Sequence, residues 1–130
     1  MAEEKALVIR VLCDAPLDVK GRRLDIRMIP FTGVCEGPLF FGRVIGTAVD
    51  TQKIRKSGDM ALSARYMLEG TDAGGAPCRV FIENRTDPEI GFRPLVVTDS
   101  PALAFLEDCP LRSTVEPAPG GVTVTILAQR

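Results

Sequence analysis

The chain has 130 residues, of which 45% are hydrophobic and 25% charged, and its 16 basic and 17 acidic residues leave a net charge of -1. This length and composition predict one ordinary globular domain over residues 1–130. The balanced charge and the lack of basic runs exclude a nucleic-acid partner. The sequence contains no histidine, which excludes a Ser-His-Asp triad, a Cys-His dyad and the common histidine-containing zinc sites.

The sequence has four cysteines, and no two of them have the CxxC spacing: Cys13, Cys35, Cys78 and Cys109. We therefore expect free thiols, no metal and no structural disulfide. The start Met-Ala-Glu-Glu-Lys does not resemble a secretory signal, and no apolar run approaches membrane-spanning length. These features predict a cytoplasmic protein with no membrane partner. There is no Walker A motif, and no cofactor is expected. Cys35, which the pattern places in a loop, is the one thiol expected to be reactive.

Short β-branched runs separated by Gly and Pro turns follow one another along the chain. They predict an all-β fold, an antiparallel β-barrel of about eight strands, with a sandwich as the alternative. Loops are expected at residues 18–23 and 53–59 and a turn at 36–38. Ser100 and Pro101 predict the N-terminus of one short helix that ends near residue 107. The expected strands are residues 6–13, 24–33, 39–51, 60–69, 77–85, 92–98, 111–115 and 122–127.

The run at residues 39–51 has two different faces. One alternating set is unusually small, which suits the crowded and curved inside of a barrel, and it ends at Asp50. The other set is also apolar. Because one barrel interior covers only one face, we expect a homo-oligomer, most simply a two-fold dimer. The outward apolar residues that favour this contact are Phe41, Ile45, Val49 and Phe81.

Residues 61–85 read as a hairpin, with two apolar runs around a Thr-Asp-Ala-Gly-Gly-Ala-Pro turn. Side-chain alternation places Tyr66 of the first strand and Asn84 of the second strand on the apolar inner faces, together with Asp50. Arg65 and Glu83 have the outward parity. They are expected to form a cross-strand ion pair, or to bind ligand themselves if the register is shifted by one residue.

Three segments resemble the family known as domain of unknown function 3237. They are Gly21-Arg22 with Ile29-Pro30-Phe31-Thr32-Gly33 and Glu36-Gly37-Pro38, then Thr47-Ala48-Val49-Asp50-Thr51, then Ala64-Arg65-Tyr66 with Thr71-Asp72 and the run from Val80 to Asn84. The likeness covers about residues 21–85. It departs from the family at Thr51, where the family has Trp, and at residues 102–106, where the family has a Tyr-Ala-Trp-Leu-Asn helix. The resemblance implies a small antiparallel barrel, similar to allene oxide cyclase and dirigent-type barrels, and no assigned activity.

Two classes of function follow from these residues. The first is a small-molecule-binding barrel, or a cofactor-free isomerase- or cyclase-type enzyme, with Asp50 and Tyr66 as catalytic residues and Asn84, Arg65 and Glu83 as ligand-binding residues. The alternative is a non-catalytic oligomeric or partner-binding module. Without a site role, Asp50 would be a turn residue bonded to backbone amides, and Tyr66 a core tyrosine. The expected cavity walls are Phe40, Val44, Leu68 and Ile82.

Overall fold

The computed structural model describes residues 2–130. Its elements are β1 (Glu3–Cys13), β2 (Leu17–Lys20), β3 (Leu24–Pro38), β4 (Phe40–Arg55), β5 (Met60–Asp72), β6 (Pro77–Asp87), β7 (Gly91–Thr98), η1 (Ala104–Glu107), β8 (Leu111–Ala118) and β9 (Gly121–Gln129).

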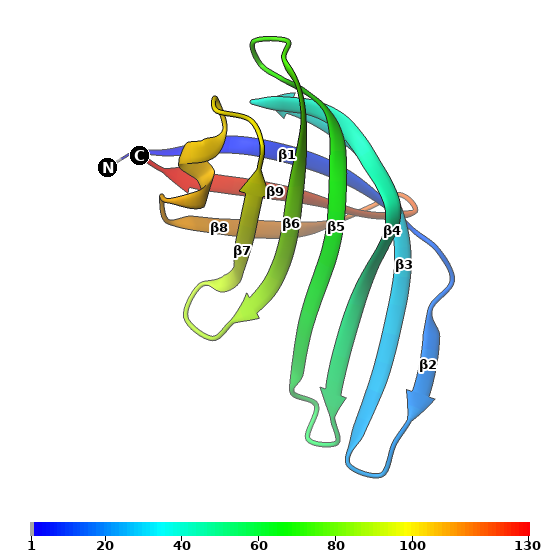
Figure 1. Cartoon of the computed structure of the whole chain (residues 1–130). Coiled ribbons are helices and arrows are strands. Elements are labelled where there is room, and N and C mark those ends of the chain that lie inside the picture. The colour runs from blue at the N-terminus through cyan, green and yellow to red at the C-terminus, as the bar shows by residue number, and fades with distance from the viewer. Residues whose placement is uncertain (1) are drawn as a thin grey trace.

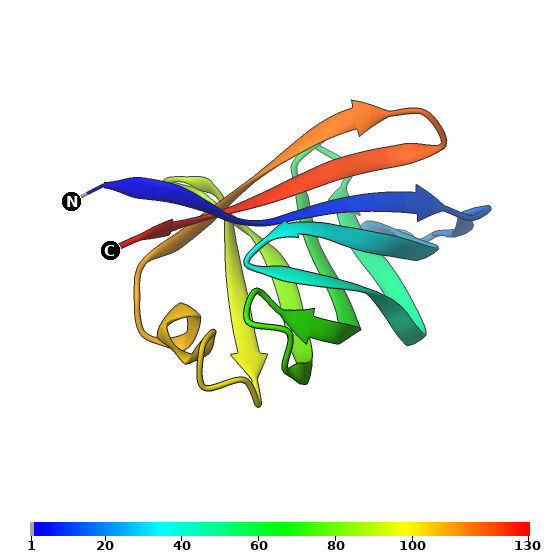
Figure 2. The same ribbon diagram turned by 90° about the horizontal axis from the view of Figure 1, so that it is seen from above.

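The strands form one antiparallel sheet that curls into a nearly closed barrel (Figure 1). Along the sheet the order is β7-β6-β5-β4-β3-β1-β9-β8, and β2 pairs with β3 outside this path. The two ends of the sheet meet where β7 contacts β8. Seen from above, β5 to β7 lie on the opposite side of the barrel from β1, β9 and β8 (Figure 2). The prediction of an all-β antiparallel barrel is confirmed.

Three of the predicted local elements are wrong. The turn expected at residues 36–38 is the end of β3, which pairs there with β1 and β4. The segment expected as a loop at residues 18–23 contains β2, because Leu17–Lys20 pairs with the first half of β3 and brings opposite charges face to face across the two strands. The expected helix is only η1, a single turn of 3-10 helix. Leu103 and Leu106 lie three residues apart, which is the repeat of a 3-10 turn, and both are buried.

Strand β4 carries a two-residue bulge relative to both of its neighbours. Between the pairs Ile45–Met67 and Val49–Arg65 it advances four residues while β5 advances two. Gly46, at the bulge, has a φ of 67°, a conformation that glycine adopts without steric penalty. Because the insertion is even, the alternation of faces is the same on both sides of it. The inward placement of Asp50 inferred from parity therefore survives the irregularity.

The barrel has one closed end and one open end. At the closed end, Leu103 and Leu106 on either side of the start of η1 belong to the buried core. At the other end the hairpins β2–β3 and β4–β5 extend beyond β6 and β7 (Figure 1). Pro30 lies where β3 changes partner from β2 to β1, and its carbonyl accepts a hydrogen bond from the backbone of Asp14. Among residues 2–130 there is no helix with the length and hydrophobicity that a membrane crossing requires.

Candidate functional site

A cavity of about 200 Å³ lies inside the barrel near its open end. Most of its lining is aliphatic or aromatic, and few polar side chains reach it. This composition is typical of sites for small organic ligands. The lining residues come from eight strands: Val11 and Cys13 of β1, Ile29 and Phe31 of β3, Asp50 and Gln52 of β4, Leu62, Ala64 and Tyr66 of β5, Asn84 of β6, Phe92 of β7, Val115 of β8 and Val122 and Val124 of β9.

The strand register explains how three predicted site residues reach one cavity. Asp50 is opposite Ala64, and Ala64 is in turn opposite Asn84, so the three form one row across β4, β5 and β6. Tyr66 lies two residues from Ala64 on the same face of β5. The small side chain of Ala64 leaves space between the two polar groups on either side of it. Asp50, Tyr66 and Asn84 therefore face a common space.

Asp50 has one oxygen with a partner and one without. Its Oδ2 accepts a hydrogen bond of 3.0 Å from the side-chain amide of Gln52. Its Oδ1 is buried and has no hydrogen-bond partner among the described residues. Burial raises the pKa of the Asp50 carboxyl, and the bond from Gln52 opposes that rise only in part. The protonated form is thus favoured more than for a carboxyl in water.

Tyr66 is 3% exposed, and its hydroxyl is the second buried oxygen without a partner in the described part of the chain. Its ring packs edge-on against Phe31, with centroids 5.2 Å apart and an interplanar angle of 75°. Burial strongly raises the pKa of the phenol, with a smaller contribution from Cys35. The group is therefore a neutral hydrogen-bond donor, not a phenolate.

Asn84 is oriented by a residue that the sequence analysis missed. The hydroxyl of Ser113 donates a 2.7 Å hydrogen bond to Asn84 Oδ1, and both side chains are buried. With its carbonyl oxygen engaged, Asn84 presents its amide hydrogens to other partners. Ser113 lies between Leu111 and Val115 at an inward position of β8. A polar residue in an apolar alternating set was the signal that could have identified it, as it could have identified Gln52.

The cavity walls predicted from the sequence are wrong. The expected walls Phe40, Leu68 and Ile82 lie in the packed core and do not line this cavity. The register accounts for this, because Val44, opposite Leu68, is six residues from Asp50 along β4. The expected walls therefore lie toward the closed end of the barrel.

Arg65 and Glu83 lie opposite each other on the outer face, as their parity predicts, and not in the cavity. Within residues 2–130 they form no ion pair with each other. The Glu83 carboxylate instead accepts a 2.8 Å hydrogen bond from Ser63. Neither side chain is long enough to pass through the sheet and contact a ligand in the cavity.

Cys35 is not in a loop. It lies in β3, is 2% exposed, and its thiol donates to the carbonyl of Phe40 at 3.2 Å. Burial raises the pKa of this thiol, which lowers its reactivity. All four cysteines are unpaired in the structure. Cys13 is exposed at the cavity rim, and burial and the nearby Asp50 raise its pKa as well.

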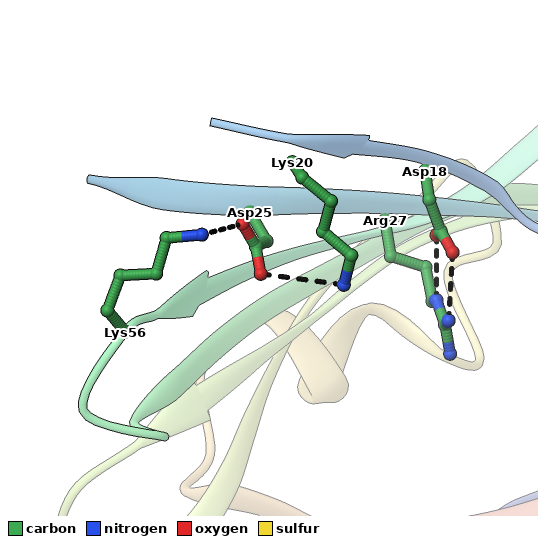
Figure 3. A network of polar contacts seen from close by, with 5 residues as sticks. All are labelled: Asp18, Lys20, Asp25, Arg27 and Lys56. Carbon is green, nitrogen blue, oxygen red and sulfur yellow. Dashed lines mark hydrogen bonds and ion pairs between the residues drawn. The ribbon is translucent and has the colours of Figure 1, made fainter. Parts of the chain in front are cut away.

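A network of charged side chains lies beside the open end of the barrel (Figure 3). Arg27 forms two hydrogen bonds with Asp18, at 2.8 and 2.9 Å. Asp25 accepts from Lys56 at 2.6 Å and faces Lys20 at 3.5 Å. Because these side chains are partly exposed, each pair contributes little stability alone. Together they hold β2 and the β4–β5 turn against β3.

Along one face of β3 and β4, the network begins one residue pair closer to the open end of the barrel than Asp50 does. Arg27 is opposite Gln52, and the next inward pair on the same two strands is Ile29 and Asp50. Gln52, which donates to Asp50, therefore separates the carboxyl from the charged groups. No three His, Cys, Asp or Glu side chains within residues 2–130 are grouped so that they could hold a metal ion. Tyr66 and Asn84 can form hydrogen bonds in the cavity, and the Asp50 carboxyl can exchange a proton there.

Comparison with known proteins supports the fold and leaves the activity open. No family model matches the chain. It is 35% identical over 97 residues to the UPF0311 protein CA_C3321 of Clostridium acetobutylicum, in a match that covers 68% of this chain and 58% of that relative. The chain thus spans less than two thirds of the curated relative that it matches.

Two solved structures have the same fold. One is a protein with unknown function from Clostridium acetobutylicum, with a TM-score of 0.80, 23% identity and coverage of 98% of this chain and 96% of the other. The second is an enzyme from Penicillium herquei, with a TM-score of 0.75, 15% identity and coverage of 98% and 92%. At these identities the likeness shows the barrel fold alone, and the chain is similar in sequence and fold to uncharacterised proteins.

Proposed function

We propose that this chain is a small-molecule-binding barrel that acts as a cofactor-free isomerase- or cyclase-type enzyme on a small, mostly apolar ligand. One observation carries the proposal: Asp50 Oδ1 and the Tyr66 hydroxyl are both buried, both lack a partner among residues 2–130, and both residues line one apolar cavity. Buried polar groups without a partner destabilise a fold. The presence of two of them beside one cavity therefore favours a ligand that completes their hydrogen bonds.

The ligand class follows from the polar groups in the cavity. Tyr66 offers an O–H donor, and Asn84 offers its amide hydrogens because its oxygen is held by Ser113. A ligand that matches them carries a carbonyl, phenol or ether oxygen as acceptor. The remaining walls are apolar, which favours a ring system or hydrocarbon around that oxygen.

The proposed reaction is an internal proton transfer. The Asp50 carboxylate removes a proton from one atom of the ligand and the resulting acid returns it to another, so no proton is gained or lost overall. Tyr66 and Asn84 donate hydrogen bonds to the oxygen on which negative charge develops. The raised pKa of Asp50 brings this group closer to neutral pH, where a carboxyl can both accept and return a proton.

Family membership belongs to the same proposal. We place the chain in the family known as domain of unknown function 3237, on the segments around Pro30, Asp50 and Tyr66, each of which supplies cavity residues. The enzyme from Penicillium herquei supports the view that a barrel of this kind can host catalysis. That support is an analogy between folds, and the chemistry rests on the cavity.

The test begins with native mass spectrometry of freshly purified protein, to detect and identify retained small molecules. Asp50→Asn and Tyr66→Phe should lose the retained compound, or its conversion, while keeping the barrel fold. Glu89→Gln, the same change of acid to amide at an exposed position of the β6–β7 turn, is the matched control. Equal retention and conversion by wild type and both cavity variants would contradict the proposal.

A further inference from the structure

An apolar row crosses the outer face of four neighbouring strands. Ile45 of β4 is opposite Met67 of β5, Met67 is opposite Phe81 of β6, and Phe81 is opposite Val97 of β7. All four have the outward parity. Val97 is 46% exposed, and the other three are half-buried, since neighbours in the row shield one another. A continuous apolar row on an outer sheet face is typical of a contact surface.

Charged residues flank the centre of this row in an alternating arrangement. On β5, Arg65 and Glu69 lie on either side of Met67, and on β6 Glu83 and Arg79 lie on either side of Phe81. The register puts Arg65 opposite Glu83 and Glu69 opposite Arg79. The four charges thus form a square with opposite signs at adjacent corners, which we call the charge square. Glu69 and Arg79 already pair at 2.9 Å within the chain.

The charge square is complementary to a two-fold copy of itself. A two-fold axis in the contact plane and parallel to the strands places β5 of one copy over β6 of the other. Every arginine of the square then faces a glutamate, and Met67 faces Phe81. An axis in the same plane but across the strands also sets every arginine over a glutamate. A two-fold contact is the commonest way in which identical chains associate.

We propose that this face, made of the apolar row and the charge square, binds a second copy of the chain as a two-fold homodimer. The half-buried Met67 and Phe81 would form the dry centre of the contact, and the four charges its polar rim. Rim charges orient the partners and reject wrong ones more than they add affinity. Phe41 and Val49, expected from the sequence to take part, lie outside the row, whereas Ile45 and Phe81 lie within it. The proposal does not depend on what the cavity binds.

The decisive experiment changes the signs of the charge square and measures mass in solution by light scattering across a dilution series. An all-acidic variant carries Arg65→Glu and Arg79→Glu, and an all-basic variant carries Glu69→Arg and Glu83→Arg. The wild type should have twice the 14.0 kDa of one chain. Each variant alone should have the mass of one chain, because like charges then face one another. An equal mixture of the two should return to the double mass.

The matched control combines all four substitutions and inverts the charge square. It changes twice as many residues as either variant, yet its signs remain self-complementary, so it should dimerise as the wild type does. Circular dichroism confirms that each protein is folded. A monomeric wild type, a dimer that survives in both single-sign variants, or a mixture that stays monomeric would overturn the proposal.

A measurement on the wild type covers the case in which a variant fails to fold. Oxidative footprinting should show Met67 protected at high protein concentration and increasingly oxidised on dilution. Met60, which is 48% exposed and lies outside the face, is the internal control and should react equally at all concentrations. Concentration-independent oxidation of Met67 would count against the proposed face as directly as a monomeric wild type.

Discussion

Asp50 and Tyr66 line the same apolar cavity, and each holds a buried oxygen atom that has no hydrogen-bond partner within residues 2–130. Each such group destabilises the folded protein by about 1–3 kcal/mol, because water no longer hydrates it. The proposed ligand would supply the hydrogen bonds that these two oxygens lack.

Tyr66→Phe should make the protein more stable and less able to bind. The change removes the unpartnered hydroxyl and keeps the edge-on contact of the ring with Phe31. We expect an increase of about 1 kcal/mol in the free energy of unfolding, from removing the desolvated group. Denaturant unfolding measures this directly. A loss of stability would instead mean that the hydroxyl is hydrogen-bonded in solution.

Asp50→Asn should reveal a pH dependence of stability. The pKa of Asp50 is raised in the folded state by burial, above its ordinary value of 3.8, so the folded state holds the proton more tightly than the unfolded state. The contribution of Asp50 to stability is therefore fully present below pH 3.8 and is lost as pH rises through the raised pKa. At neutral pH the asparagine variant should be more stable than wild type.

The measurement is urea unfolding of both proteins from acidic to neutral pH. The difference in unfolding free energy between variant and wild type should grow as pH increases through the raised pKa, and then level off. Glu89→Gln, whose carboxylate is exposed, serves as the control for the loss of one acid. A difference that shrinks with rising pH would show that the Asp50 pKa is lowered, not raised.

The inward placement of Asp50, Tyr66 and Asn84 could be predicted because strand alternation has a period of two and the β4 bulge adds an even number of residues. The register could not be predicted, since it depends on pairing between distant segments. For this reason the expected walls Phe40, Leu68 and Ile82 lie toward the closed end instead of around the cavity.

Other features depend on tertiary partners that local sequence does not reveal. Leu17–Lys20 becomes a strand only because the first half of β3 offers a free edge with complementary charges. Ser113 joins the site because the barrel brings β8 opposite β6, although the two are not paired. The Glu36–Pro38 turn was expected from composition, yet these residues continue β3 and pair with β1 and β4.

Ser113→Ala should damage the site through Asn84 alone. The substitution leaves Asn84 Oδ1 buried without its 2.7 Å bond, which should cost about 1–3 kcal/mol of unfolding free energy. Asn84 would then be free to rotate its amide, and ligand retention should fall. Ser57→Ala, at an exposed serine, controls for the loss of a hydroxyl. Unchanged stability would mean that water replaces the lost donor.

Asp72→Asn should weaken the closed end of the barrel without affecting the cavity. Backbone hydrogen bonds, first that of Ala76, together with one from Ser100, hold the pKa of Asp72 below 3.8. Its contribution is therefore present above pH 3.8 and is lost as pH falls through the lowered folded-state pKa. The variant should be less stable at neutral pH, and its disadvantage should shrink in acid, with ligand retention unchanged. Native mass spectrometry beside acid unfolding checks both outcomes.

Ala64 offers a steric test of the cavity, because it separates Asp50 from Asn84 in their common row. In Ala64→Leu the larger side chain should enter the space between these polar groups. Since it fills existing space, each added carbon that becomes buried contributes about 0.8 kcal/mol, so stability should hold or rise. Ligand retention should be lost with both polar residues intact. The control is Ala61→Leu, on the exposed outer face of the same strand. Retention of the compound by Ala64→Leu, with stability unchanged, would place the ligand elsewhere than between Asp50 and Asn84.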